Sequence, residues 1–389
     1  MIKAGNHGDD VRSDCLVSLE IRESGGLDIV IRSKVGVMYE DNIRDLCREV
    51  MIFLGIEHAH VEIDDTGALP YVLAARIETA VKRARPDIDK EYLPEMADTC
   101  RYKSKPDRLR RSRLYLPGNT PKFAINAGLH NPDGAILDLE DSVAPSEKDA
   151  ARILVRNTLR CVDFYGSERM VRINQIPMGL KDLRYIIPHN VHLVLIPKCE
   201  TADQVHQVDA AIAEIASQCN RFEPVYLMPI IESALGVVNA YDIAAASENN
   251  VALTIGLQDY TADIGAEKTK EGHESYFARC QVVNAARAAR LQPIDTVFAD
   301  VGDEEGLIQS VLEAKSLGYE GKGCIHPRQI KTIHETFAPT PEELDKARKI
   351  VEAFEEAQKK GSSVTVLGTK MIDPPVVKRA QRVLKLSEA

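Results

Sequence analysis

From Ser112 onward, short apolar segments alternate with stretches of helical periodicity, and this alternation constrains the fold more than any other feature of the sequence. Apolar strands that alternate with helices are typical of a parallel sheet covered on both faces. Eight such segments favour a closed (β/α)8 TIM barrel over an open doubly wound sheet. No G-x-G-x-x-G motif follows the first segment, which disfavours a nucleotide-binding fold. The predicted strands are Arg113–Leu116, Ala135–Leu139, Val171–Ile173, Leu193–Ile196, Val225–Pro229, Ala252–Ile255, Thr296–Ala299 and Gly323–Ile325.

The first 86 residues follow a different pattern, which predicts a small α+β domain. Cys15–Ile21 alternates apolar and polar residues like a half-buried strand, and Gly25-Gly26 predicts a hairpin turn into a second strand, Leu27–Ile31. A helix around residues 43–54, a third strand, His60–Ile63, and a helix around residues 69–81 complete the order ββαβα.

The predicted elements divide the chain into four segments. Polar, proline-containing residues separate the first domain from the barrel and are interpreted as a linker. The barrel is followed by a helix from about residue 342 to 360, a turn-rich stretch and a final helix. The segments are residues 1–86, the linker 87–110, the barrel 111–338 and the C-terminal segment 339–389.

Composition excludes several classes of function. The formal net charge of −10, with Arg108–Arg113 as the one basic cluster, makes nucleic acid an unfavourable partner. No apolar run approaches the roughly 20 residues that cross a bilayer, and the N-terminus lacks a signal-peptide core. The eight cysteines form no C-x-x-C pair, which is typical of reduced thiols, so we expect a cytoplasmic protein without membrane association.

Charged residues follow several predicted strands, at the barrel face where active sites of this fold lie. Acid-rich strand ends without cysteine or histidine clusters favour a hard divalent cation, above all Mg²⁺. Glu232 and Asp259 close neighbouring strands and form the predicted ligand pair, unless they only pair with Arg172 or Lys198. Arg172 suits a substrate carboxylate, because its planar fork donates two parallel hydrogen bonds, although a structural salt bridge is the alternative. Strand seven is predicted to end at Asp300, and strand eight at His326, which is interpreted as structural.

Several ordered motifs between residues 111 and 385 resemble the citrate lyase beta subunit and its relatives, the citramalyl- and malyl-CoA lyases. Ser233 departs from the common pattern, where threonine is usual. The motifs are Arg111-Ser112-x-Leu114-x-x-Pro117-Gly118, Leu139-Glu140-Asp141-x-Val143, Val171-Arg172-x-Asn174, Pro197-Lys198, Ile231-Glu232-Ser233, Gly256-x-x-Asp259 and Gly321-Lys322-x-x-Ile325-His326-Pro327-x-Gln329.

This resemblance implies roles for individual residues. Glu232 and Asp259 correspond to the magnesium ligands, and Arg172 to the clamp for the oxaloacetate carboxylate. Met371-Ile372-Asp373-x-Pro375 resembles the lid motif, whose aspartate enters a neighbouring subunit's mouth, so Asp373 is a catalytic candidate in trans. The remaining candidates are the acids near the metal, Glu140 and Asp141, and the substrate or pantetheine channel residues Arg111, Pro117, Gly118 and Lys198.

The N-terminal domain resembles the gamma subunit of citrate lyase, its acyl carrier. The resemblance rests on Cys15-Leu16-Val17, residues 61–69 and Leu73-x-Ala75-Arg76-x-Glu78. That family attaches a phosphoribosyl dephospho-CoA arm to a serine near its first strand. The candidate here is Ser13, although the usual pattern leaves one residue between serine and aspartate, whereas Asp14 follows Ser13 directly.

The resulting hypothesis is a magnesium-dependent carbon–carbon lyase that cleaves a citryl thioester to oxaloacetate and an acetyl thioester. The linker 87–110 is predicted to be flexible, so that the carrier domain swings. A lid in trans requires a homo-oligomer, and acyl exchange requires a partner acyltransferase resembling the alpha subunit. Three alternatives stay open: a citramalyl- or malyl-CoA lyase acting on free CoA thioesters, a non-catalytic carrier and scaffold, and a pyruvate-type class II aldolase.

Overall fold

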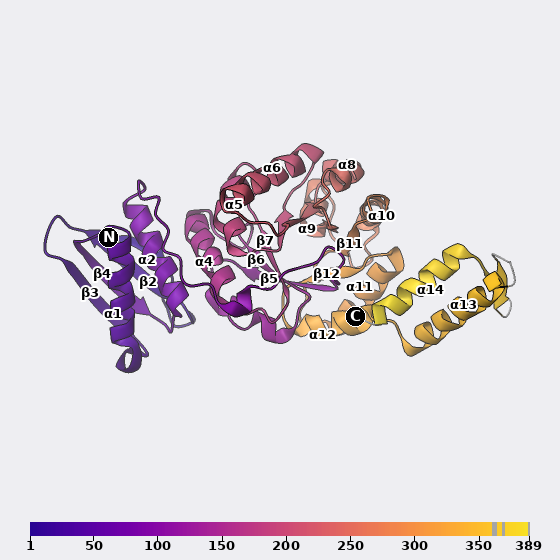
Figure 1. Ribbon diagram of the computed structural model, residues 1–389, viewed down its shortest axis with the longest axis horizontal. Coiled ribbons are helices and arrows are strands. Elements are labelled where there is room, and N and C mark those ends of the chain that lie inside the picture. Colours follow the sequence, from indigo (N-terminus) through magenta and orange to yellow (C-terminus); the bar gives the residue numbers. More distant parts are fainter. Residues whose placement is uncertain (360–363, 368–369, 388–389) are drawn as a thin grey trace.

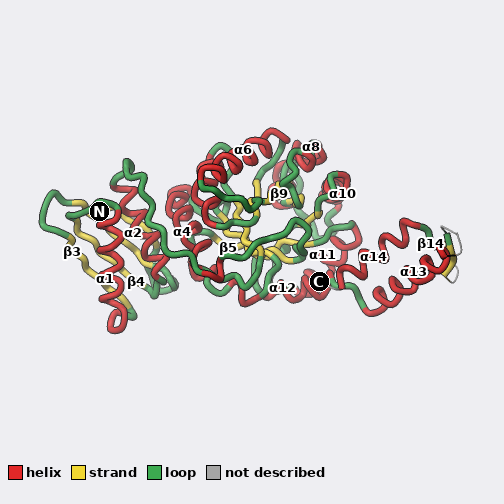
Figure 2. Tube along the Cα trace, in the orientation of Figure 1, coloured by secondary structure: helices red, strands yellow, loops and turns green. Residues whose placement is uncertain are grey.

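The computed structural model describes residues 1–359, 364–367 and 370–387. It has three parts in a row, which are an N-terminal α+β domain, a closed barrel and a projecting C-terminal pair of helices (Figure 1). Helices surround the strands of the barrel, whereas both helices of the first domain lie against its sheet (Figure 2). The fold class predicted from the sequence is therefore confirmed.

The N-terminal domain contains a four-stranded sheet in the order β1-β2-β4-β3. The central strand is β4, which pairs antiparallel with β2 and parallel with β3. The predicted hairpin at Gly25-Gly26 is therefore wrong, because β4, whose alternate residues Val61 and Ile63 are buried, inserts between the two strands. The sequence reasoning also missed β1. The elements are β1 (Ile2–Gly5), β2 (Cys15–Ile21), β3 (Leu27–Ser33), α1 (Gly36–Phe53), β4 (Ala59–Asp65) and α2 (Pro70–Ala84).

Eight parallel strands close the barrel, with β12 paired to β5. Seven predicted strands overlap observed ones, but the segment Thr296–Ala299 is not a strand. The seventh strand lies just before it, where Pro293 and the buried Asp295 hid the strand from a search for apolar runs. The strands are β5 (Ser112–Pro117), β6 (Gly134–Asp138), β7 (Glu168–Arg172), β8 (Leu193–Ile196), β9 (Tyr226–Ile231), β10 (Ala252–Ile255), β11 (Gln292–Asp295) and β12 (Gly321–Cys324).

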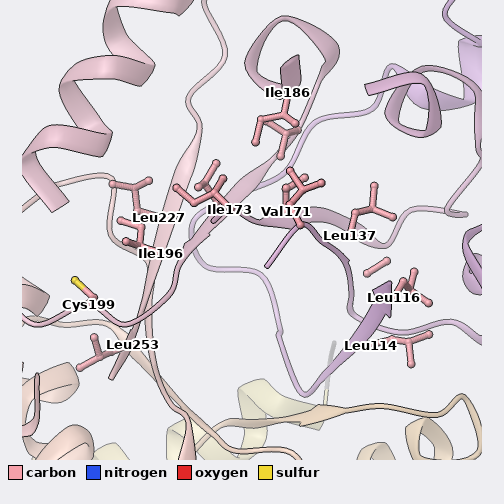
Figure 3. Close-up of a cluster of buried hydrophobic side chains, with 14 of the residues drawn as sticks. Leu114, Leu116, Leu137, Val171, Ile173, Ile186, Ile196, Cys199, Leu227 and Leu253 are labelled. Atoms are coloured by element: carbon pink, nitrogen blue, oxygen red, sulfur yellow. The ribbon is translucent and has the colours of Figure 1, made fainter. Parts of the chain in front are cut away.

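Side chains of the barrel strands form two apolar layers, because successive residues of a strand point to opposite faces. Ile136 belongs to the cluster inside the barrel, whereas its neighbour Leu137 packs between the sheet and the helices. Figure 3 shows Leu137 with Leu114 and Val171 in this outer layer. The surrounding helices are α3 (Pro121–Ala124), α4 (Lys148–Cys161), α5 (Met178–Ile186), α6 (Ala202–Gln218), α7 (Ala234–Val238), α8 (Ala240–Ala245), α9 (Leu257–Asp263), α10 (His273–Ala288), α11 (Glu304–Leu317) and α12 (Arg328–Phe337).

The C-terminal segment forms an arm that extends away from the barrel and has a small core of its own (Figure 1). Its two helices pack through residues such as Phe354 and Val377, and two short antiparallel strands lie at its far end. The elements are α13 (Pro341–Lys359), β13 (Thr365–Leu367), β14 (Lys370–Ile372) and α14 (Pro374–Ser387).

The N-terminal domain is docked on the barrel through helices α2 and α4. At the centre of this contact, both guanidinium nitrogens Nη1 and Nη2 of Arg156 donate to Glu78, at 3.0 and 2.6 Å, and both side chains are fully buried. Arg83 makes a second two-pronged ion pair with Asp149, at 2.7 Å for each bond. Buried charges require such partners, so the two domains are held in one orientation.

Residues 87–110 are not the flexible linker that the sequence predicted. Cys100 is fully buried, and the Tyr102 hydroxyl donates to the Ser167 carbonyl at 2.6 Å. Arg110 forms a fully buried ion pair with Glu168, at 2.7 Å, at the start of β7. The segment lacks regular structure because its side chains, rather than a backbone ladder, attach it to the barrel.

Two further features bear on the surroundings of the chain. None of the helices in the described ranges is long and apolar enough to cross a membrane. All eight cysteines lie in these ranges, and each is a free thiol.

The buried pair between the domains predicts a large effect on stability. Replacing Arg156 with Ala leaves the Glu78 carboxylate buried with only Lys82 as an ionic partner, at 3.1 Å. We expect the free energy of unfolding to fall by about 3–5 kcal/mol, the usual consequence of breaking a buried pair. Urea denaturation followed by circular dichroism measures this change. The control Lys349→Ala breaks an exposed pair with Asp345 and should change stability by less than about 0.5 kcal/mol; equal effects of the two variants would contradict the assignment.

Candidate active site

A cavity of about 440 Å³ lies at the C-terminal ends of the barrel strands. Of the residues predicted from the sequence, Arg172, Glu232, Asp259, Asp141 and Pro117 line it. Lys198 and Glu140 join the same group through their ion pairs with these side chains. Barrel closure therefore brings together acids and bases that lie on five different strands or the loops after them.

Arg172, the last residue of β7, is held by an aspartate that the sequence reasoning missed. Its Nε and Nη2 atoms donate to the two carboxylate oxygens of Asp138, at 2.7 and 2.8 Å. Burial alone would raise the pKa of Asp138, but the hydrogen bonds and charge of Arg172 hold it below its usual value. The Nη1 atom of Arg172 lies 3.1 Å from Glu140. Asp138 therefore fixes one edge of the guanidinium and leaves the Nη1 side directed at the acids of the mouth.

The neighbouring acids Glu140 and Asp141 form a coupled pair. Burial, a hydrogen bond with Glu140 and its charge raise the pKa of Asp141 to about 6. Burial acts in the same direction on Glu140, but its hydrogen bonds and the charges of Arg172 and Lys198 outweigh it and lower the pKa. Near neutral pH Asp141 is therefore the member of the pair that more readily holds a proton.

Lys198 connects this pair to the two predicted metal ligands. Its backbone has the left-handed φ of 46°, which is uncommon for a residue with a side chain. Its backbone N–H donates to Glu232 at 2.6 Å, while its Nζ lies 3.2 Å from Glu140 and 3.9 Å from Asp259. Its Nζ also lies 3.6 Å from Asp141, so this one residue contacts all four acids.

Glu232 and Asp259 have the properties of a hard-cation site. Glu232 is 5% exposed, and burial, with the charge of Asp259, raises its pKa to about 8. A β-carbon at Gly256 would lie 2.5 Å from Oε2 of Glu232, so only glycine lets the end of β10 approach this carboxyl group. No cluster of three or more metal-binding side chains occurs in the described residues. A cation would therefore take two oxygens from protein and the rest from water and substrate, which is the usual environment of Mg²⁺.

Some predicted residues are not at the mouth. Arg111 precedes β5, and its Nε and Nη2 bind Asp133 at 2.9 and 3.1 Å, at the opposite end of the strand from Pro117. Its predicted place in the thioester channel is wrong, because six strand residues separate the two ends.

Asp300 is exposed in the loop after β11, where it accepts a hydrogen bond from Gly302. His326 lies after β12, where its ring accepts from the Arg328 backbone.

Asp373 lies between β14 and α14, on the arm that projects away from the barrel (Figure 1). It precedes α14, and its carboxylate accepts the backbone N–H of Val376 at 3.2 Å. In a single chain it thus caps a helix, and its role in trans stays a prediction.

The loop that carries Ser13 lies beside the first strand end of the barrel. Ser13 is half-buried, with a φ of 58°, and Asp14 next to it accepts two hydrogen bonds from Arg76, at 2.9 and 2.8 Å. The same guanidinium donates to the side chain and carbonyl of Asn119, at 2.7 and 3.0 Å. Asn119 follows Gly118 and the cavity residue Pro117.

Other residues of the cavity also escaped the sequence reasoning. Tyr115 packs its ring 5.3 Å from the Arg172 guanidinium carbon, and Arg113 and Thr254 lie on the cavity wall. The signal was present for Asp138, because residues two apart on a strand point to the same face and Ile136, two positions earlier on β6, lies inside the barrel.

Comparison with protein families identifies three matching regions. Residues 111–327 match the HpcH/HpaI aldolase/citrate lyase family, and residues 273–389 match a family of C–C bond lyases of the TIM-barrel fold. Residues 4–84 match an acyl-carrier family described as the malonate decarboxylase delta subunit.

Individual relatives agree with these matches. The chain is 40% identical over 288 residues to the citrate lyase subunit beta of Leuconostoc mesenteroides subsp. cremoris, covering 73% of this chain and 95% of that protein. It is 33% identical over 311 residues to mitochondrial citramalyl-CoA lyase of Mus musculus, covering 76% and 90%.

A solved structure has the same architecture. The protein CitE from Mycobacterium tuberculosis, in complex with magnesium, acetoacetate and coenzyme A, aligns with a TM-score of 0.59 and 28% identity, covering 72% of this chain and 99% of that one. Together with the acids and arginine at the mouth of the barrel, these matches show that the chain belongs to the HpcH/HpaI aldolase/citrate lyase family, as a carbon–carbon lyase of the citrate lyase beta type preceded by an acyl-carrier-like domain.

Proposed function

We propose that this protein cleaves a citryl thioester to oxaloacetate and an acetyl thioester in a magnesium-dependent reaction. The observation that carries the proposal is the convergence of Glu232, Asp259 and Arg172 in one cavity. The carboxyl group of Glu232 is buried there, and the nearby positive charge does not compensate for the effect of burial on its pKa. The magnesium and coenzyme A bound by the Mycobacterium tuberculosis protein support it. A bound Mg²⁺ would lower the pKa of the tertiary hydroxyl group of the substrate.

The residues of the chain would then position the reacting groups. Glu232 and Asp259 would hold the cation, and the Nη1 side of Arg172 would bind the carboxylate next to the hydroxyl carbon. One of the two predicted catalytic acids, Glu140 or Asp141, would accept the hydroxyl proton as the bond between this carbon and the α-carbon of the thioester breaks. The keto acid forms, and the electron pair passes to the thioester as an enolate.

The enolate carbon must gain a proton, and Asp373 of a neighbouring subunit is the proposed donor. Its position on an arm that projects from the barrel supports a role in another copy of the chain, and hence a homo-oligomer (Figure 1). To donate, the carboxyl group must be protonated, which requires desolvation in the partner's mouth.

The thioester is proposed to be carried on the chain's own Ser13 through a phosphoribosyl dephospho-CoA arm. Arg76, which binds both Asp14 and Asn119, places the Ser13 loop next to the strand end that lines the cavity. Because the domains are fixed by buried ion pairs, the arm rather than the domain would move. An acyltransferase subunit resembling the citrate lyase alpha subunit is the proposed partner that exchanges acetyl for citryl.

A second candidate is cleavage of citramalyl-CoA or malyl-CoA as free thioesters, which the similarity to the mouse citramalyl-CoA lyase favours. Steady-state cleavage of citryl-CoA, citramalyl-CoA and malyl-CoA, with detection of the keto acid, separates the two. Absence of cleavage of all three in the presence of Mg²⁺ would overturn the proposed function.

Neutralising one predicted ligand should remove most of the metal affinity. We expect Glu232→Gln and Asp259→Asn each to weaken Mg²⁺ binding by more than about 100-fold, since even loss of a group behind a metal ligand weakens binding by about 10- to 100-fold. Isothermal titration with MgCl₂ measures this without any turnover. Glu200→Gln makes the same change just after β8, outside the cavity, and should bind Mg²⁺ like the unmodified protein. Unchanged affinity in both ligand variants would exclude this site.

The role of Asp373 in trans predicts complementation between two inactive variants. Asp373→Asn should lower kcat by at least about 100-fold, the usual contribution of a positioned proton donor. Glu232→Gln should lower it at least as much, because it removes a proposed ligand of the catalytic cation. When the two are refolded together, mixed oligomers contain mouths with an intact Glu232 and an arm with an intact Asp373. Activity of the mixture should clearly exceed the sum of the separate variants. A mixture no more active than that sum would show that Asp373 acts in its own chain or not at all.

Modification of Ser13 predicts an added mass. Protein isolated from the organism that encodes it should carry one phosphoribosyl dephospho-CoA group by intact mass spectrometry, and Ser13→Ala should lack it. Ser24→Ala changes an exposed serine of the same domain and should keep the group. If the chain without any substitution shows only the mass of its sequence, the carrier role of Ser13 is excluded. The substrate would then have to be a free thioester.

A further inference from the structure

Arg113 lies on the floor of the cavity, although it is the second residue of β5 and was predicted only as part of a strand. Residues of a strand alternate between faces, so Arg113, Tyr115 and Pro117 all point into the barrel, and all three line the cavity. Arg113 is 1% exposed. A guanidinium group is thus placed beneath the acids of the mouth.

The hydrogen-bond partners of Arg113 are all uncharged. Nη1 lies 2.9 Å from the sulfur of Met228, which is a weak acceptor, and Nη2 donates to the Thr254 hydroxyl at 3.1 Å and to the Asp295 carbonyl at 3.3 Å. The Nε atom is buried without a partner among the described residues. Burial lowers the pKa of Arg113, so the charged group is held at a free-energy cost.

The acids near Arg113 are already paired with other bases. The Asp295 carboxylate accepts from Lys322 at 2.7 Å and lies 3.2 Å from Arg279, and the other end of Arg279 pairs with Glu313 at 2.9 Å. Within the described ranges Arg113 forms no ion pair. Several cations surround Asp295, and the one without an ion pair to it that lines the cavity is Arg113. The others are Lys322, Arg279 and Lys268.

Arg169 provides a useful contrast. It is also 1% exposed, its Nε is also unpartnered, and it too lacks an ionic partner among the described residues. However, it donates to the carbonyls of Leu159 and Cys100, stacks 4.6 Å from the ring of Tyr102 and does not line the cavity. Two carbonyl oxygens and the ring stabilise the charge of Arg169. Arg113 has one carbonyl, one hydroxyl group and a weakly accepting thioether, and it lies beside the cavity.

We propose that Arg113 binds a second carboxylate of the substrate and so selects citryl over citramalyl and malyl thioesters. The three substrates differ in one substituent on the hydroxyl carbon, which is a carboxymethyl, a methyl or a hydrogen. Arg172 near the rim takes the carboxylate that all three share, and Arg113 on the floor takes the additional carboxylate that only the citryl group has. A charged ligand group there restores the missing ionic partner. This inference rests on the proposed lyase function and specifies its substrate.

The test compares two keto acids that differ by the same carboxylate. In the presence of Mg²⁺, isothermal titration with oxaloacetate and with pyruvate gives an affinity ratio that does not depend on turnover. The unmodified protein should bind oxaloacetate about 10- to 100-fold more tightly than pyruvate, the effect of a hydrogen-bonded charged group. Arg113→Met, which keeps much of the side-chain length, should reduce this ratio to within about threefold of one while leaving pyruvate affinity unchanged. Arg113→Lys should retain part of the preference.

Cleavage of citryl-CoA and citramalyl-CoA provides the second readout. Arg113→Met should lower kcat/KM for citryl-CoA by about 10- to 100-fold and leave that for citramalyl-CoA within about threefold. Arg169→Met removes an equally buried arginine outside the cavity. It should leave unchanged both the ratio of oxaloacetate to pyruvate affinity and the ratio of kcat/KM for citryl-CoA to that for citramalyl-CoA. A variant that loses both substrates equally, or a protein that binds oxaloacetate and pyruvate alike, overturns the inference.

The two proposals fail in different ways. If neither thioester is cleaved, the lyase function is wrong, but the binding ratio still reports whether Arg113 recognises a second carboxylate. If both are cleaved and Arg113→Met does not change the ratio, the lyase function stands and the specificity assignment is wrong.

Discussion

An excess of negative charge at one rim of the barrel governs the chemistry of this protein. Five carboxyl groups, those of Asp138, Glu140, Asp141, Glu232 and Asp259, share two neighbouring cations, Arg172 and Lys198. The imbalance is visible in the raised pKa values of Glu232 and Asp141, because burial penalises charge that no partner compensates. In the proposed function a bound Mg²⁺ would remove this imbalance, because coordination would hold the carboxyl groups ionised.

The same electrostatic principle joins the carrier-like domain to the barrel. Glu78 of the first domain forms a buried ion pair with Arg156 of the barrel, and breaking this contact would leave a buried charge without its partner. Arg76, which is paired with Asp14 inside the first domain, also donates across the boundary to Asn119. A fixed domain changes how a fused carrier can act. The Ser13 loop is held close to the strand end that lines the cavity. In the proposed carrier role, delivery of a thioester would therefore depend on the reach of the arm and not on diffusion of the domain.

The two arginines of the cavity, Arg172 and Arg113, differ in how far neighbouring carboxylates balance their charge. Arg172 is held by Asp138 and Glu140 before any ligand arrives, which orients it accurately and weakens its attraction for further anions. Arg113 has polar but uncharged partners, so its charge is available to a ligand. A site with one oriented and one uncompensated guanidinium is suited to a ligand with two carboxylates.

The sequence by itself determined the order of strands and helices and the acids and bases at the strand ends, because the period of apolar residues is a local property. It was sufficient to predict the barrel and to place Glu232, Asp259 and Arg172 at the ends of its strands, where they line the cavity. Tertiary structure decided which charges meet. Arg113 and Thr254 are 141 positions apart, and Arg156 and Glu78 are 78 apart, so no local pattern reveals either contact. For the same reason, the insertion of β4 between two strands, the pairing of Arg111 with Asp133 and the packing of residues 87–110 emerged only from the folded chain. In each case the partners are brought together by folding and not by their spacing in the sequence.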